Sequence, residues 1–129
     1  MMKILVFGNP LVKQDSIQLD IVSSLQKEFP EIEFKVMPDS EELDDEGRDL
    51  VIIDAVAGIK EAVLIENLDS LSTEKIYSLH DFDLAYTLKL MKKMGMIDSV
   101  KILGIPQKVS KKEAVAQLKN LIYKVCFNA

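Results

Sequence analysis

The sequence predicts a single-domain α/β protein, a three-layer α/β/α sandwich with a mainly parallel five-stranded sheet. Short apolar runs, typical of buried strands, alternate along the chain with segments in which apolar residues recur every three or four positions, as in amphipathic helices. The length of 129 residues suffices for one buried core and is too short for two ordinary domains. We therefore expect residues 1–129 to form this one domain.

The first third of the chain predicts a strand, a helix and a second strand. Residues 3–7 (KILVF) form an apolar run that a Gly-Asn-Pro turn stops, as expected of a strand buried on both faces. Residues 15–29 carry apolar side chains at helical spacing, with Asp15 or Ser16 as the N-cap and a proline directly after the segment. Residues 31–37 alternate polar and apolar side chains, which is typical of an edge strand.

The middle of the chain predicts an acidic loop and the centre of the sheet. Residues 39–48 carry six acids and suit a solvated loop. Residues 50–53 (LVII) are the most strand-like segment, and they end at Asp54. We expect this strand to lie in mid-sheet. Residues 59–70 fit a strand or a helix, and a strand through residues 62–65 (AVLI) is favoured.

The following segment predicts a strand that leads into a helix. Residues 75–79 (KIYSL) suit a strand, and His80 follows them. Asp81 or Asp83 then caps a helix that ends at Gly95. Apolar residues on one face of this helix are expected to face the core: Leu84, Leu88, Met91 and Met94. The cluster of Met91, Met94 and Met96 is interpreted as core filling.

The C-terminal part predicts the last strand and the last helix. Residues 100–105 (VKILGI) form an apolar run that a proline stops. Ser110 and Glu113 match the capping-box pattern ahead of an amphipathic helix that reaches Val125.

Composition excludes several classes of protein. The net charge is −5 and neither sign forms a long block, which argues against binding to a nucleic-acid backbone. One cysteine and one histidine exclude zinc fingers, HExxH peptidases and thioredoxin-like redox motifs. The apolar stretch near the N-terminus is far shorter than a signal sequence or a membrane span, so we expect a cytoplasmic protein without membrane insertion.

Three ionisable residues follow the predicted strands: Asp15, Asp54 and His80. Because loops that leave parallel strands gather at the carboxyl edge of the sheet, these residues can converge there. Two carboxylates and one imidazole suit a divalent first-row metal with open coordination positions. Structural roles compete with this hypothesis. Asp15 can be a helix cap, His80 a surface residue, and Asp54 the partner of a buried charge or donor.

Four sequence motifs occur in order over nearly the whole chain. Residues 4–11 (ILVFGNPL), followed by Asp15, form a strand, a Gly-Asn-x-Leu turn and the acid that opens a helix. Residues 49–55 (DLVIIDA) form a hydrophobic strand that ends in Asp-Ala. Residues 78–80 (SLH) and 103–106 (LGIP) complete the series. Together the motifs resemble those of the NiFe-hydrogenase maturation endopeptidases, or hydrogenase maturation proteases.

The resemblance implies a site and an activity. In that family an acid of the first motif, the aspartate of the second and the histidine of the third contact nickel, and these positions match Asp15, Asp54 and His80. The implied activity is that of an aspartate/histidine metal-site endopeptidase, which removes the C-terminal extension of a hydrogenase large-subunit precursor after nickel insertion. The nickel is then carried by the substrate, and the free protein could hold another divalent cation. The implied fold is phosphorylase/hydrolase-like, and we expect a monomer.

Two alternatives stay open at this point. Asp54 ends a middle strand where a receiver-like domain would carry its phosphoacceptor, although Gly8 and Asn9 stand where such a domain needs an acidic pair. A divergent member of the same fold that binds without cleaving is the other alternative, because Phe7 and Gln14 depart from the family pattern.

Overall fold

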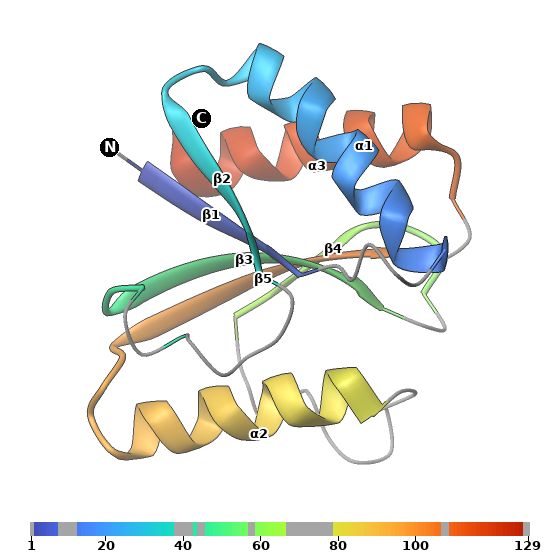
Figure 1. The fold of residues 1–129 in the computed structure, drawn as a ribbon. Helices are drawn as coiled ribbons and strands as arrows, with labels where there is room; N and C mark the ends of the chain where they lie inside the picture. The colour runs from blue at the N-terminus through green and yellow to red at the C-terminus, as the bar shows by residue number, and fades with distance from the viewer. Residues whose placement is uncertain are drawn as a thin grey trace.

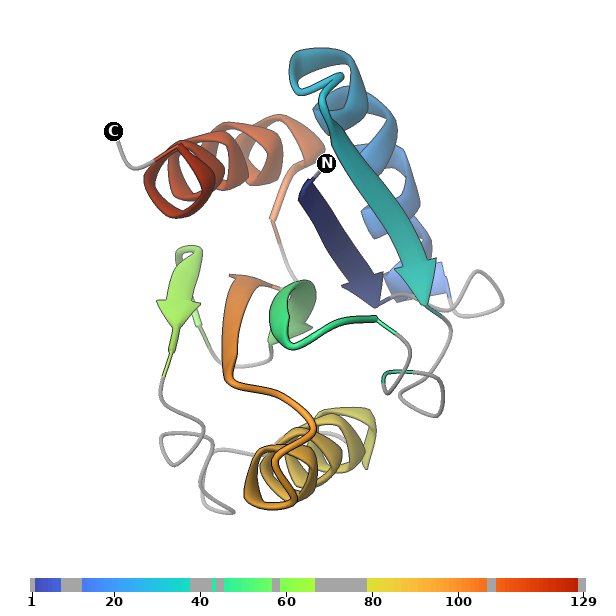
Figure 2. The same ribbon diagram turned by 90° about the vertical axis from the view of Figure 1, so that its left-hand side faces the viewer.

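A five-stranded sheet lies between two layers of helices in the computed structural model of the chain (Figure 1). The structure describes residues 2–7, 13–37, 43, 46–56, 59–66, 79–106 and 109–127, and for residues 13–19, 56, 79–83 and 85 it describes the backbone alone. Helices α1 (Lys13–Glu28) and α3 (Lys111–Cys126) cover one face, and α2 (Leu79–Lys93) covers the other (Figures 1 and 2). The predicted three-layer α/β/α architecture is confirmed.

The strands follow the predicted order along the chain. They are β1 (Met2–Phe7), β2 (Ile32–Met37), β3 (Asp49–Val56), β4 (Val63–Ile65) and β5 (Ser99–Pro106). In the sheet their order is β2-β1-β3-β5-β4, and only β4 is antiparallel to its neighbour. The mainly parallel sheet, the central position of β3, the edge position of β2 and the strand within residues 62–65 are therefore confirmed.

Each face of the sheet has its own apolar core, because successive residues of a strand point to opposite faces. In β1, Ile4 and Val6 belong to the core under α1 and α3, whereas Leu5 and Phe7 belong to the core under α2. All four side chains are at most 1% exposed. Burying a side chain of this size contributes about 1.5–3 kcal/mol, which explains why a six-residue strand holds its place mid-sheet.

The start of α2 differs from the prediction. The helix begins at Leu79, so neither Asp81 nor Asp83 is its cap. Leu79 is helical and not the end of a strand, and residues 75–78 lie outside the described residues. A short apolar run fits a strand and a buried helix equally well by periodicity, which is why this prediction was wrong at Leu79.

The start of α3 agrees with the prediction. Ser110 is the N-cap, and its Oγ accepts a hydrogen bond from the backbone N–H of Glu113 at 3.2 Å. This bond satisfies one of the backbone donors that a helix start leaves without an intrahelical partner, typically worth about 1 kcal/mol.

Methionines near the end of α2 differ in burial. Met91 is 6% exposed and belongs to the core, as predicted. Met94 and Met96 are 65% and 36% exposed, so their interpretation as core residues was wrong. The physical reason is that the helical period places Met94 next to Leu90 on the outer side and away from Leu88, and the helix ends at Lys93 before Met96. In the part of the chain that the structure describes, no helix is long and apolar enough to cross a membrane.

Candidate functional site

Asp54 is a buried acid in the central strand. It is 4% exposed and lies beside Gly104 of β5. Its side chain shares the face of β3 that carries Leu50 and Ile52, both of which belong to the core under α2. Among the described residues no buried side-chain nitrogen or oxygen lacks a hydrogen-bond partner, so the cost of burying this carboxylate is offset.

The strand does not end at Asp54, contrary to the prediction. Pairing between β3 and β5 continues through Ala55, opposite Ile105, and Val56, opposite Pro106. Asp54 therefore belongs to the rigid sheet and not to the loop that leaves it. Small apolar residues after an acid continue a strand when the neighbouring strand is equally long, and the sequence of one strand does not reveal the length of its neighbour.

Asp15 and His80 lie in the first turns of two helices. Asp15 is the third residue of α1, which begins at Lys13, so it is not the cap that the sequence predicted. His80 is the second residue of α2 and so does not lie in a loop after a strand. Both helices begin at the edge of the sheet where β1 and β3 end (Figure 1). An acid within the first turn also interacts favourably with the helix dipole.

The convergence of the three side chains stays a prediction. The backbone brings the three positions to the same edge of the sheet, but the side chains of Asp15 and His80 lie outside the described part. Among the residues whose side chains are described, no group of three histidine, cysteine or acidic residues could hold a metal ion. Asp15 and His80 are not among those residues, so the metal-binding trio stays a prediction.

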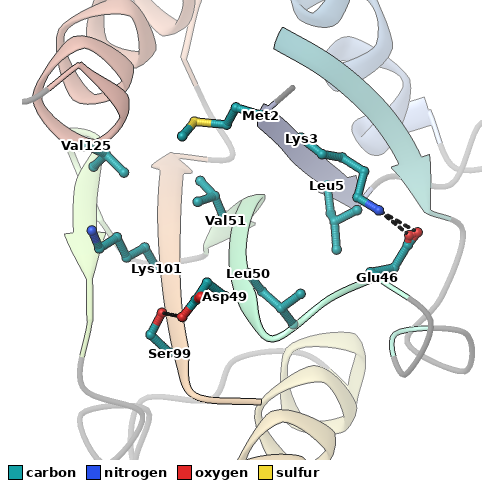
Figure 3. A pocket seen from close by; sticks show the side chains of 10 residues that line it. All are labelled: Met2, Lys3, Leu5, Glu46, Asp49, Leu50, Val51, Ser99, Lys101 and Val125. Carbon is teal, nitrogen blue, oxygen red and sulfur yellow. Dashed lines mark hydrogen bonds and ion pairs between the residues drawn. The ribbon is translucent and has the colours of Figure 1, made fainter. Parts of the chain in front are cut away.

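A second buried acid, Glu46, was not predicted from the sequence. Its side chain is 2% exposed and forms ion pairs with two lysines of neighbouring strands; Figure 3 shows the pair with Lys3. Lys35 Nζ donates to Oε1 at 2.6 Å, and Lys3 Nζ donates to Oε2 at 3.0 Å. Burial alone would raise the pKa of Glu46, but the two lysines outweigh it and hold the pKa below its usual value. The interpretation of residues 39–48 as a solvated loop was therefore wrong at Glu46.

A pocket of about 490 Å³ lies at the opposite edge of the sheet (Figure 3). It is lined by the first residues of β1, β3 and β5, by Glu46 and by Val125 of α3. Ser99 donates a hydrogen bond to Asp49 at 2.7 Å in its wall. Asp15 and His80 belong to the first turns of α1 and α2, which begin at the other edge of the sheet, so this pocket is separate from the predicted site.

Comparisons with known proteins add a family and a fold. A family model described as hydrogenase maturation protease (HycI) matches residues 34–128, a range that includes Asp54 and His80 but not Asp15. No curated protein sequence matches the chain.

Three solved structures are similar in fold. The hydrogenase maturating endopeptidase HybD from E. coli has a TM-score of 0.65 and 15% identity, over 98% of this chain and 94% of its own. A hydrogenase 3 maturation protease has a TM-score of 0.61 and 21% identity, over 93% and 88%. An uncharacterized protein from Wolinella succinogenes has a TM-score of 0.55 and 19% identity, over 93% and 95%. At these identities the likeness shows the fold alone.

Proposed function

Because the chain belongs to the hydrogenase maturation protease family, we propose that it is an endopeptidase that removes the C-terminal extension of a NiFe-hydrogenase large-subunit precursor after nickel insertion. The match of the family model over residues 34–128 is the observation that carries this proposal. The family implies a hydrogenase precursor as the substrate. The cleavage position, the dependence on nickel, the cytoplasmic location and action as a monomer belong to the proposal.

In the proposed reaction, Asp15, Asp54 and His80 contact the nickel that the precursor carries. The burial of Asp54 supports this role, because a carboxylate in a low-dielectric environment interacts strongly with a cation. Rigid pairing of β3 with β5 supports it too, because a ligand on a sheet keeps its position better than one on a loop. The contact holds the scissile peptide near the trio and ties cleavage to a precursor that already contains nickel.

The proposed chemistry is hydrolysis of one peptide bond. Water adds to the carbonyl carbon, the C–N bond breaks, and the new amine leaves with a proton. No Ser-His or Cys-His pairing is apparent in the sequence, so we propose direct attack by water without a covalent enzyme intermediate. Nickel on the substrate can polarise the carbonyl or lower the pKa of the attacking water.

The test compares nickel-loaded and nickel-free precursor. The purified chain is incubated with each, and intact mass is recorded over time. We expect loss of the C-terminal extension from the nickel-loaded precursor and none from the nickel-free precursor. Equal cleavage of both would contradict the role of nickel, and cleavage of neither would contradict the endopeptidase function. Binding of the precursor without cleavage would identify the non-catalytic alternative.

The receiver-like alternative agrees poorly with the sheet. Receiver-like and other flavodoxin-like sheets have the order 2-1-3-4-5. Here β5 lies next to β3, and β4 is an antiparallel edge strand. This arrangement gives no reason to prefer phosphorylation of Asp54 over the peptidase function.

A further inference from the structure

The face of α2 that points away from the sheet carries large apolar side chains. Tyr86, Leu90 and Met94 follow one another at four-residue spacing and are 61%, 44% and 65% exposed. Residues four apart are neighbours on a helix surface, so these three form one continuous stripe. The fold does not require the stripe, because α2 already packs on the sheet through its opposite side.

Positive charge accompanies this stripe. Lys93 is exposed beside it, three residues after Leu90 on the helix surface, and residues 84–94 contain three lysines and no acid. The chain as a whole has a net charge of −5, so this part of α2 differs in sign from the molecule that carries it. A surface that is both apolar and basic is complementary to a partner segment that is apolar and acidic. Methionine at position 94 suits such a contact, because its flexible side chain adapts to a partner's shape.

Two other occupants fit less well. A second copy of the chain placed across a two-fold axis would bring the same lysines together, and like charges would repel. An anionic membrane would attract the lysines but repel a molecule of net charge −5, and three apolar side chains are few for membrane insertion. A second copy of the chain and an anionic membrane are therefore tested as alternative occupants below.

The position of the stripe relates it to the proposed activity. His80 lies in the first turn of α2, six residues before Tyr86 along the same helix, an axial rise of about 9 Å. A partner that lies along the outer side of α2 thus extends toward the edge of the sheet where α1 and α2 begin (Figure 1). A precursor held on α2 would have its C-terminal extension within reach of that edge.

We propose that the α2 docking face, formed by Tyr86, Leu90, Lys93 and Met94, binds an acidic amphipathic segment of the hydrogenase large-subunit precursor. This inference rests on the proposed function and adds to it the surface that selects the substrate. Docking away from the predicted trio would increase the affinity for the precursor and leave the bond-breaking step unchanged.

The test separates substrate binding from catalysis. Leu90→Gln with Met94→Gln removes the apolar stripe, and Lys93→Glu reverses the charge beside it. For each of these variants we expect KM for the nickel-loaded precursor to rise about tenfold, as for loss of an important interface residue, with kcat within about twofold of the wild type. The charge variant should also lose the salt dependence of KM that the wild type shows.

Matched controls change exposed residues elsewhere. Val36→Gln alters a 39% exposed side chain on the edge strand β2, and Lys111→Glu with Lys112→Glu reverses two exposed charges at the start of α3. Both controls should keep the wild-type KM. All variants change exposed positions, so their Tm should stay close to that of the wild type and report correct folding.

The outcomes distinguish failure of the proposed endopeptidase function from failure of the docking inference. If the wild type does not process the precursor, the proposed function fails. If the wild type processes it and both docking-face variants keep the wild-type KM, the docking inference is overturned. Dimers in analytical ultracentrifugation that Leu90→Gln with Met94→Gln abolishes would overturn it in favour of a second copy. Binding to phosphatidylserine vesicles that Lys93→Glu abolishes would overturn it in favour of a membrane.

Discussion

At the scale of single residues, Glu46 is a buried charge that the fold keeps ionised. Its carboxylate bonds Lys3 of β1 and Lys35 of β2, which are 30% and 47% exposed. In the sheet Lys35 lies beside Leu5, so the two lysines share one face and both reach the same acid. The acid links the loop before β3 to two neighbouring strands. The sequence shows a lysine in each of these two strands, but their common face and their shared acid follow from the register of the sheet.

We predict that Glu46→Gln destabilises the protein by about 1–3 kcal/mol, because the substitution removes two ion pairs from a buried position and leaves two lysines facing each other. The measurement is the free energy of unfolding from urea titration. Glu31→Gln, at an exposed acid directly before β2, is the control and should change stability by less than about 0.5 kcal/mol. Equal stability of the two variants would show that the buried carboxylate contributes nothing.

Glu46 should also make the free energy of unfolding depend on pH. The pKa of Glu46 is lower in the folded chain than in the unfolded one, so acid favours the unfolded state. Its stabilising contribution is complete above the unfolded pKa of about 4.3 and is lost as the pH falls through the lower folded pKa. The difference in unfolding free energy between wild type and Glu46→Gln should therefore shrink on acidification below about pH 4.3. A difference that stays constant to pH 2.5, or grows, would contradict this assignment.

At the scale of elements, the end of α2 is set by Gly95. The backbone N–H of Met96 donates to the carbonyl of Met91 at 2.9 Å, and that of Gly95 donates to Lys92 at 3.1 Å. These two bonds form a Schellman motif, which requires positive φ at the glycine, here +76°. Arg48 donates to the Gly95 carbonyl at 2.7 Å and so attaches this turn to the start of β3.

Gly95→Ala is expected to destabilise the protein by about 1 kcal/mol. An added Cβ would meet no atom within 4 Å, so the cost comes from backbone strain at positive φ and not from a clash. Gly95→Asn should cost less, because asparagine tolerates this conformation better than alanine. Urea midpoints of the three proteins give the order. If the alanine variant is as stable as the wild type, the turn does not depend on glycine.

The start of a helix was predictable where two independent signals agree, whereas the end of a strand was not predictable from its own sequence. For α3 the amphipathic spacing and the Ser110 cap agree, and the helix begins where both indicate. For α2 the aspartates indicated a start that the structure does not have, because an acid in a first turn is as favourable as an acid at the cap. Central strand β3 was found from its apolar run, but its end depended on pairing with β5, a contact between distant parts of the chain.

At the scale of the whole molecule, the sheet separates two edges with different contents. The described pocket lies at the amino edge and is built around structural ion pairs and the starts of strands. The predicted site residues belong to positions at the other edge, where α1 and α2 begin (Figure 1). Segments that follow parallel strands begin at one edge of the sheet, and for this reason a site composed of residues 15, 54 and 80 could be proposed from the sequence. The burial of Asp54 was anticipated by its place after three apolar residues, whereas the ion pairs of Glu46 depend on the tertiary fold.

The proposed nickel-contacting site is tested most directly by the rate at which single variants process nickel-loaded precursor. Asp15→Asn, Asp54→Asn and His80→Gln remove one proposed nickel contact each, and Asp20→Asn changes an exposed acid of α1 as the matched control. Circular dichroism and Tm establish which variants are folded. We predict that each folded site variant loses at least about a hundredfold in rate, a loss typical of removing one transition-state contact, whereas Asp20→Asn keeps the wild-type rate. Folded site variants that cleave as fast as Asp20→Asn would contradict the assignment of Asp15, Asp54 and His80.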